Sequence, residues 1–205
     1  METKWLDSSS QVLDAKQQQI MAEMAPLWDE AEDLWESSKN EKAFGLFVAG
    51  DYSTIFRSLV QLRPRARTFL EWGSGLGVVT IMASRLGFEA YGIEHEPELV
   101  ALSRKLAEEY GPLARFATGN FIPGGYAWTG QHGDENFRTP FETCEPGYSE
   151  LGMELEDFDL VYAYPWPDEQ ELYQDILEQC GHRKALLLSY DAREGLMLSR
   201  RMRKR

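Results

Sequence analysis

The chain has 205 residues, of which 43% are hydrophobic, and its formal net charge is −13 at pH 7. This length and apolar content suit one well-buried domain and are small for two. The negative charge argues against nucleic acid or an anionic membrane as a partner, because both favour a basic surface. Two cysteines are too few for a disulfide framework, and the chain starts without an apolar or basic leader. We therefore expect a cytoplasmic protein that does not associate with membranes.

Residues 1–50 are predicted to form an N-terminal helical extension. Apolar residues recur there at alternating steps of four and three, which places them on one stripe of a helix: Ile20, Met24, Leu27, Ala31 and Leu34. Pro26 lies inside this pattern and predicts a kink or a break. We expect the stripe to dock on the rest of the chain, and self-association through this helix is the alternative.

From residue 51 onward, helices and strands alternate. Helices are predicted over 53–62 (with Ser53 as N-cap), 77–87, 97–111 and 169–180. Strands are predicted at 67–72, 89–95, 114–120, 158–164 and 184–190. This alternation predicts an α/β fold with a doubly wound, mostly parallel sheet and helices on both faces.

Three glycines occupy five positions where the first of these strands meets the next helix, in the stretch EWGSGLG at 71–77. Gly73, Gly75 and Gly77 should therefore lie at the carboxyl end of the sheet, where open α/β sheets bind ligands. The dinucleotide fingerprint would need a glycine at Val78, and the Gly-Lys-Ser/Thr ending of a phosphate loop is absent. A pyrophosphate ligand, and with it a nicotinamide oxidoreductase, is disfavoured.

EWGSGLG resembles the glycine-rich first motif of class I S-adenosylmethionine-dependent methyltransferases, and the similarity continues through GFEAYGIEHEPELVALSRKLA at 87–107. This second segment is most similar to small lysine methyltransferases related to the ATP synthase c-subunit enzyme. The resemblance covers 66–120 well, the segment FDLVYAYPWP moderately and the first forty residues not at all. It implies a Rossmann-like fold and makes 51–205 a methyltransferase domain. It also implies S-adenosyl-L-methionine as the cofactor and a protein side chain, such as lysine, or a small molecule as the methyl acceptor.

The resemblance also assigns the cofactor-binding residues: Glu71, Gly73, Ser74, Gly75, Gly77, Glu94 and Asn120. Glu94 ends the second strand and is expected to accept hydrogen bonds from the ribose hydroxyls. Glu71 is expected to orient the glycine loop and the cofactor's ammonium group. Asn120 is expected at the adenine edge, with the capping of a turn as the alternative.

The candidate catalytic residues are aromatic: Tyr52, Tyr164 and Trp166. Tyr164 and Trp166 belong to a Tyr-Pro-Trp-Pro turn where amino-directed members of the family carry Asp/Asn-Pro-Pro-aromatic. An aromatic wall could surround a methylammonium or a sulfonium group by cation–π attraction, although packing of the proline turn explains these rings equally well. Asp51 and Tyr52 precede the domain where related enzymes close over the cofactor, and helix capping with side-chain packing is the alternative for this pair.

The segment 121–157 contains six glycines and is predicted to be a lid over the substrate. No metal is expected, because the spacing of His132, Asp134, Glu135 and Cys144 fits no standard site. Only fifteen residues follow the last predicted strand, so at most GLMLSRR can add one antiparallel strand. We therefore expect fewer than the seven strands usual for the family, with an edge shielded by arginines. A non-catalytic module that binds S-adenosylmethionine or S-adenosylhomocysteine is the alternative function.

Overall fold

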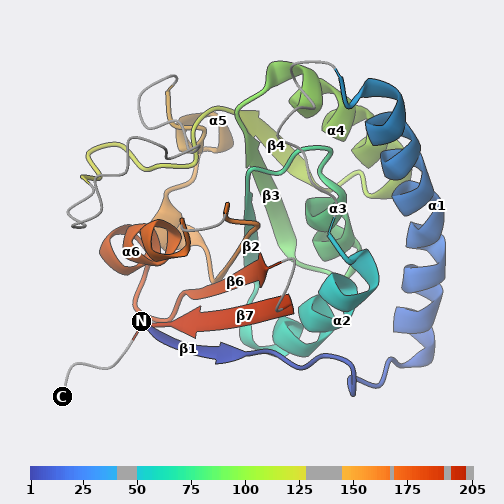
Figure 1. The fold of residues 1–205 in the computed structure, drawn as a ribbon, viewed down its shortest axis with the longest axis horizontal. Helices are drawn as coiled ribbons and strands as arrows, with labels where there is room; N and C mark the ends of the chain where they lie inside the picture. The colour runs from blue at the N-terminus through green and yellow to red at the C-terminus, as the bar shows by residue number, and fades with distance from the viewer. Residues whose placement is uncertain (41–49, 128–144, 167–168, 192–194, 202–205) are drawn as a thin grey trace.

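The computed structural model describes residues 1–40, 50–127, 145–166, 169–191 and 195–201 (Figure 1). Its centre is a seven-stranded sheet in the order β1-β7-β6-β5-β2-β3-β4. The strands are β1 (Glu2–Trp5), β2 (Thr68–Trp72), β3 (Glu89–Glu94), β4 (Arg115–Thr118), β5 (Leu160–Ala163), β6 (Leu186–Asp191) and β7 (Gly195–Arg200). Strands β2 to β6 pair in parallel, whereas β7 runs antiparallel to both of its neighbours. The predicted α/β class with a mostly parallel sheet is confirmed.

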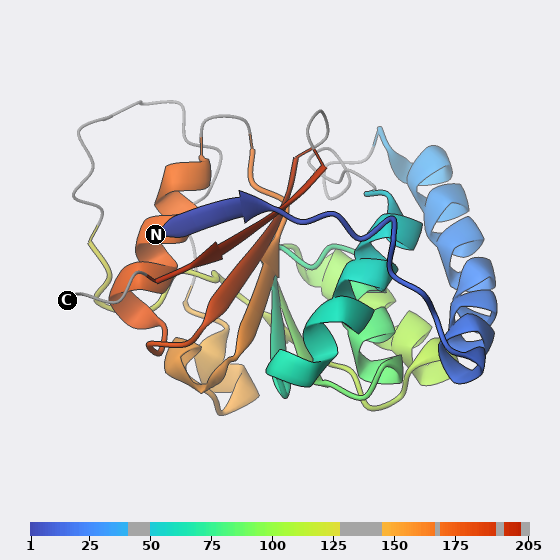
Figure 2. The ribbon, with the colours of Figure 1, turned by 90° about the horizontal axis from the view of Figure 1, so that it is seen from below.

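Helices cover both faces of this sheet (Figure 2). They are α1 (Ala15–Ser38), α2 (Tyr52–Leu62), α3 (Val78–Arg85), α4 (Pro97–Tyr110), α5 (Tyr148–Leu151) and α6 (Gln170–Cys180), with 3-10 turns η2 (Arg63–Arg65) and η3 (Leu155–Asp157). The α2, α3 and α4 helices pack on one face with α1 outside them, and α5 and α6 lie on the other. Alternate strand residues supply the two cores: Phe69 packs toward α2, and Leu70 packs toward α6.

The long α1 helix docks on the domain through the predicted stripe. Ile20, Met24, Leu27 and Ala31 are buried in the core that α2 and α3 share. The helix starts at a capping box, in which the Asp14 side chain accepts from the Gln17 N–H and the Gln17 side chain accepts from the Asp14 N–H. The chain stays helical through Pro26, so the predicted break is wrong.

The N-cap of α2 differs from the prediction by two residues. Asp51, rather than Ser53, precedes the helix, and its Oδ1 accepts from the Thr54 N–H at 3.1 Å. Its second oxygen accepts from the Thr54 hydroxyl at 2.7 Å. An N-cap side chain reaches the N–H groups two or three residues later, and Asp51 stands three residues before Thr54. The capping alternative for Asp51 is therefore present.

The sheet has more strands than we predicted. The stretch GLMLSRR does supply one antiparallel strand, β7, but its outer edge is paired with β1 from the start of the chain. Thr3 and Ser199 pair through their hydroxyls at 3.0 Å, and Glu2 forms an ion pair with Arg200. All four residues of β1 are exposed. The stretch therefore lacks the alternation of apolar and polar residues that predicts a half-buried strand. The domain boundary at residue 50 stays a prediction, and this pairing crosses it.

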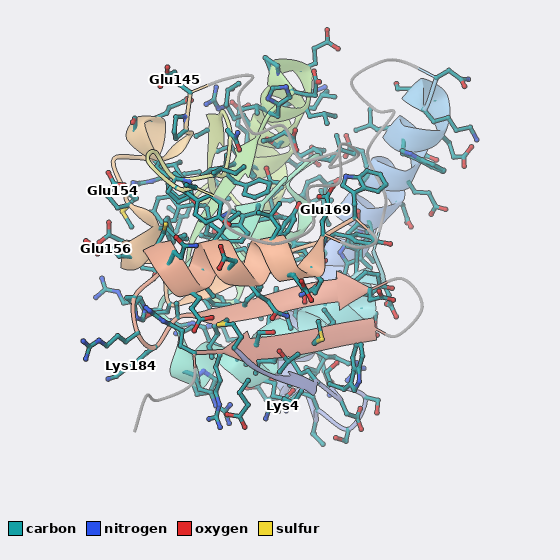
Figure 3. The ribbon with its side chains drawn as sticks, turned by 60° about the vertical axis from the view of Figure 1, so that its left-hand side comes forward. Lys4, Glu145, Glu154, Glu156, Glu169 and Lys184 are labelled. Carbon is teal, nitrogen blue, oxygen red and sulfur yellow. The ribbon has the colours of Figure 1, made fainter. Side chains whose placement is uncertain are left out.

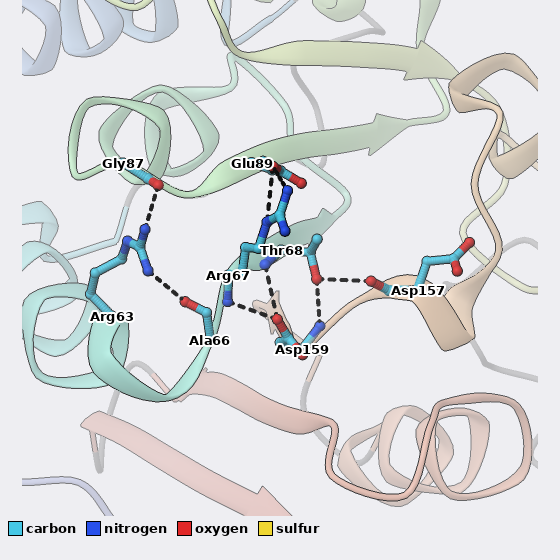
Figure 4. Close-up of polar contacts among 8 residues, drawn as sticks. All are labelled: Arg63, Ala66, Arg67, Thr68, Gly87, Glu89, Asp157 and Asp159. Atoms are coloured by element: carbon cyan, nitrogen blue, oxygen red, sulfur yellow. Dashed lines mark hydrogen bonds and ion pairs between the residues drawn. The ribbon is translucent and has the colours of Figure 1, made fainter.

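At the amino end of the sheet, Asp159 joins the starts of β2 and β5 (Figure 4). Its Oδ2 accepts from the backbone N–H groups of Arg67 at 2.7 Å and Thr68 at 3.1 Å. The Thr68 hydroxyl accepts from the Asp159 N–H and donates to the Asp157 carbonyl, both at 2.8 Å. Burial alone would raise the pKa of Asp159, but these hydrogen bonds and the nearby His182 bring it below its ordinary value.

We predict that Asp159→Ala lowers the free energy of unfolding by about 1–3 kcal/mol, because two backbone donors lose their acceptor. The lowered pKa means that the carboxylate stabilises the fold above its unfolded pKa and loses this effect as pH falls through the folded pKa. Urea denaturation of the variant and the parent should therefore converge below about pH 4. The matched control is Glu156→Ala on the exposed turn nearby. Equal losses in both variants would contradict the role of Asp159.

Candidate functional site

The loop between β2 and α3 is held on the end of β3. The N–H groups of Gly73 and Ser74 both donate to the Ile93 carbonyl, at 2.9 and 3.0 Å, and the Gly77 N–H donates to the Ser74 carbonyl at 2.7 Å. Gly73, Gly75 and Gly77 have φ values of 67°, 53° and 75°, in the left-handed region that favours glycine. The structure thus places the glycine motif at the carboxyl edge of the sheet, as predicted.

Two of these glycines are required for different physical reasons. A Cβ on Gly73 would meet no atom within 4 Å, so this position leaves open space beside the loop. A Cβ on Gly77 would lie 2.5 Å from the Phe116 ring and 2.9 Å from the Ser103 Cβ. The missing side chain of Gly77 therefore allows α3 to begin in close contact with β4 and α4. The missing side chain of Gly73 leaves the space beside the loop unoccupied by protein atoms.

Glu94 ties this loop to the end of β3. Its Oε2 accepts from the Gly75 N–H at 2.8 Å, and its Oε1 accepts from the Glu96 N–H at 3.0 Å. The side chain is buried, and burial raises the pKa of Glu94 although the backbone hydrogen bonds and His95 oppose this rise. A carboxylate has about four acceptor positions, so its contacts with backbone N–H groups leave it further capacity.

Glu71 belongs to β2, and its side chain reaches the first turn of α3. Its Oε2 accepts from both the N–H (2.9 Å) and the hydroxyl (2.6 Å) of Thr80. Because Gly77 has no side chain to cap α3, the carboxylate of Glu71 supplies that acceptor from β2. Burial raises the pKa of Glu71 to about 8; the Thr80 bonds oppose the shift, and the charge of Glu94 adds to it. The predicted contact with an ammonium group stays a prediction.

Ser74 lies within the loop, and Asn120 follows β4. The Ser74 hydroxyl oxygen is buried and has no hydrogen-bond partner among the described residues. The Asn120 side-chain oxygen accepts from the Ile122 N–H at 2.9 Å, and its backbone bonds to Glu145 and Gly147. This is the turn-capping arrangement that was the alternative for Asn120. The adenine role stays a prediction.

The candidate aromatic residues lie in two groups. Tyr52 stacks on Trp28 with ring centroids 6.2 Å apart, and Tyr164 meets Tyr190 edge to face at 5.0 Å. Burial first, and then the charges of Glu71 and Glu32, raise the pKa of Tyr52. The stack on Trp28 is the predicted packing alternative for Tyr52.

Two buried residues at this edge were not predicted from the sequence. Tyr162 is buried at the end of β5, where burial and then the charges of Glu71 and Tyr52 raise its pKa. It shares a face of the strand with Tyr164 at a spacing of two, which is the signal that could have identified it. Glu169 is 3% exposed and lies at the start of α6, beside the carboxyl end of β6 (Figure 3). A single glutamate before a helix gives no comparable signal.

Part of the predicted lid lies outside the described residues, including His132, Asp134, Glu135 and Cys144. The part that the structure describes packs into the domain, since the indole N–H of Trp72 in β2 donates to the Tyr148 hydroxyl at 3.0 Å. Within the described ranges, no group of three or more His, Cys, Asp or Glu residues could hold a metal ion. No helix in that same part of the chain is long and apolar enough to cross a membrane.

No family model matches the chain, and no curated protein matches it significantly. Its structure is similar to an RNA methyltransferase from Salinibacter ruber in complex with S-adenosyl-L-homocysteine, with a TM-score of 0.51 and 19% identity over 74% of this chain and 91% of that one. A hypothetical protein of Thermus thermophilus gives a TM-score of 0.52 at 18% identity, over 76% and 89% of the two chains. An O-methyltransferase from Bacillus cereus gives 0.48 at 10% identity, over 87% and 66%. The first two likenesses, with TM-scores above 0.5, show the fold, which is Rossmann-like.

We predict that Gly77→Ala costs more stability than Gly73→Ala. Both substitutions place a side chain at positive φ, which costs about 1–2 kcal/mol. Only Gly77→Ala also forces a Cβ against Phe116 and Ser103, and such overpacking adds about 1–3 kcal/mol. Chemical denaturation of the two variants should separate them, and equal losses would contradict the packing role of Gly77.

We predict that Glu71 makes stability fall as the pH rises from about 5 to 8. In that window the folded chain keeps a proton on Glu71 that the unfolded chain has released, because burial raises the folded pKa from 4.5 to about 8. Glu71→Gln should flatten the pH dependence of unfolding by on the order of 1 kcal/mol per pH unit. Exposed Glu98→Gln is the control, and an unchanged slope in Glu71→Gln would refute the shift.

Proposed function

We propose that the chain is an S-adenosylmethionine-dependent methyltransferase that acts on a protein side chain such as lysine, or on a small molecule. The observation that carries the proposal is the contact between Glu94 at the end of β3 and the Gly75 N–H in the loop after β2. It joins the two motifs of the resemblance at the edge where open α/β sheets bind ligands. The fold shared with solved methyltransferase structures supports the same activity.

The residues of this edge fit a nucleoside cofactor with a cationic tail. Glu94 keeps acceptor capacity for a ribose hydroxyl beyond its contacts with backbone N–H groups. Gly73 leaves open space beside the loop, and the buried hydroxyl of Ser74 has no hydrogen-bond partner among the described residues. Glu71 fixes the start of α3, while Asn120 holds the turn after β4 in which we place the adenine.

When bound, S-adenosylmethionine supplies an activated methyl group on a sulfonium. The protein must then hold the acceptor in line and exclude water, and such positioning can contribute about 7–11 kcal/mol to lowering the barrier. We assign this task to the aromatic residues Tyr52, Tyr164 and Trp166. Tyr164 and Trp166 are half-buried, and a poorly hydrated aromatic wall lowers the pKa of a lysine acceptor and attracts its methylammonium product.

The proposed setting is cytoplasmic, and the proposed acceptor is not a nucleic acid. The net charge of −13 opposes the approach of a polyphosphate backbone. Cys180 is half-buried, and burial followed by the charge of Asp175 raises the pKa of its thiol, which keeps it unreactive. Self-association through α1 stays a prediction; the buried stripe of that helix is already occupied by the domain.

Titration calorimetry with S-adenosylhomocysteine and with NAD tests the cofactor. We expect S-adenosylhomocysteine to bind and NAD not to bind. Glu94→Gln should weaken that binding by about 1.5–3 kcal/mol, the range for a hydrogen bond to a charged group. Glu98→Gln, on the exposed first turn of α4, should leave the affinity unchanged. Binding of NAD alone would sink the proposal.

Catalysis requires a separate measurement. The chain is incubated with isotope-labelled S-adenosylmethionine and candidate proteins and metabolites, and mass spectrometry locates the label. Label on an acceptor supports the methyltransferase, and its position identifies the acceptor class. Tight cofactor binding without transfer to any acceptor favours the non-catalytic module instead.

A further inference from the structure

A pocket lies away from the glycine loop, between α1, α2 and the segment that precedes α1. Its volume is about 690 Å³, and its walls are the segment 9–13, one side of α1 and Arg57 of α2. Small-molecule sites commonly have volumes of about 300–1,000 Å³. This pocket therefore has the size of a ligand site, and the proposed methyltransferase chemistry does not use it.

One wall of the pocket is apolar and shallow. Met21, Ala22, Ala25 and Trp28 follow one another at helical spacing on a side of α1 that differs from its buried stripe. The two alanines leave room, whereas Met21 and the Trp28 ring close the two ends. Such a strip can cover a short hydrocarbon chain.

The opposite wall carries one positive charge. Arg57 donates from Nη1 to the Gln11 carbonyl at 3.0 Å, and no carboxylate of the described residues lies within ion-pair distance of it. None of the described residues that line the pocket is acidic. The acids next to this segment, Asp7 and Asp14, accept hydrogen bonds within their own turns. The guanidinium fork of Arg57 thus keeps donors for a planar anion.

The segment 9–13, which forms one wall of the pocket, is already held in place by hydrogen bonds. The Ser8 hydroxyl donates to the Thr54 carbonyl at 3.2 Å, and the Gln11 N–H donates to the Ser8 carbonyl at 3.0 Å. The Gln18 side-chain amide donates to the Leu13 carbonyl at 3.0 Å, and Leu13 itself is buried. A site that is formed before binding loses little of its binding energy to ordering.

We propose that this pocket binds a small amphipathic carboxylate, with the carboxylate on Arg57 and the hydrocarbon chain along Met21, Ala25 and Trp28. This ligand accounts for both the cation and the apolar strip. A fully polar ligand would leave the strip uncovered, and a fully apolar ligand would leave Arg57 without an anion. Trp28 also stacks on Tyr52, the first residue of α2. A ligand that contacts Trp28 would therefore lie one ring away from Tyr52.

The test uses octanoate, with octanol and acetate as probes that keep only the apolar or only the anionic half. Calorimetry measures the affinities, and the indole N–H resonance of Trp28, assigned with Trp28→Phe, reports the location. We expect octanoate to bind at least about tenfold more tightly than either half-probe, as one charge-assisted hydrogen-bonded contact provides. Absence of octanoate binding, or equal affinity for octanol, overturns the proposal.

Two variants separate the site from non-specific adsorption. Arg57→Gln should lower the affinity for octanoate about tenfold and leave that for octanol unchanged. Arg201→Gln is the matched control, because Arg201 also donates to a backbone carbonyl at 3.0 Å, in this case that of Gly181. Ala25→Trp fills the strip without removing the cation and should abolish binding, even if Arg57→Gln disturbs the fold. Octanoate binding that survives Ala25→Trp, or that Arg57→Gln and Arg201→Gln reduce equally, overturns the proposal.

Discussion

The structure of the carboxyl edge depends on two buried carboxylates that hold one glycine turn. Glu71 reaches from β2 to the first turn of α3, and Glu94 reaches from β3 to Gly75. Burying such groups is costly unless their oxygens are hydrogen-bonded, and each has at least two donors. The turn is therefore positioned before any ligand arrives, and preorganised dipoles of this kind are what catalytic sites require.

Much of the fold could be predicted because its signals are local. The stretches around Phe69, Ile93 and Val161 are short apolar runs between turn residues, and α4 is bounded by Pro97 and Gly111, so strands and helices fall close to their predicted positions. The glycine spacing and the carboxylate of Glu94 likewise indicate their place at the edge. Part of what could not be predicted is non-local. The pairing of β1 with β7 is decided by partners distant in the sequence. The choice of Asp51 over Ser53 as N-cap is instead a local one, because two neighbouring residues could both cap the helix.

The aromatic residues show where inference from sequence ends. We predicted the same role for Tyr52 and Tyr164, yet each packs against a ring of another element, Trp28 in one case and Tyr190 in the other. A contact with another aromatic ring orients the side chain whether or not a ligand binds to the other face of that side chain. The residue type alone therefore does not distinguish packing from ligand binding. The stack of Tyr52 on Trp28 also connects the α1 pocket to the first residue of α2, so the pocket and one candidate catalytic residue share a ring contact.

The pairing of β1 with β7 has a consequence for how the chain is made. Thr3 and Ser199 are separated by 196 positions, so β1 leaves the ribosome long before its partner strand exists. Until then the central strands can assemble, because β2, β3 and β4 follow one another closely along the chain. Contacts between such distant positions form late, since a long loop must close first. The nascent protein thus carries an unpaired edge until β7 has emerged. β1 then becomes the outer strand in place of β7, and a short exposed strand that carries Glu2 and Lys4 resists strand addition by a neighbouring chain.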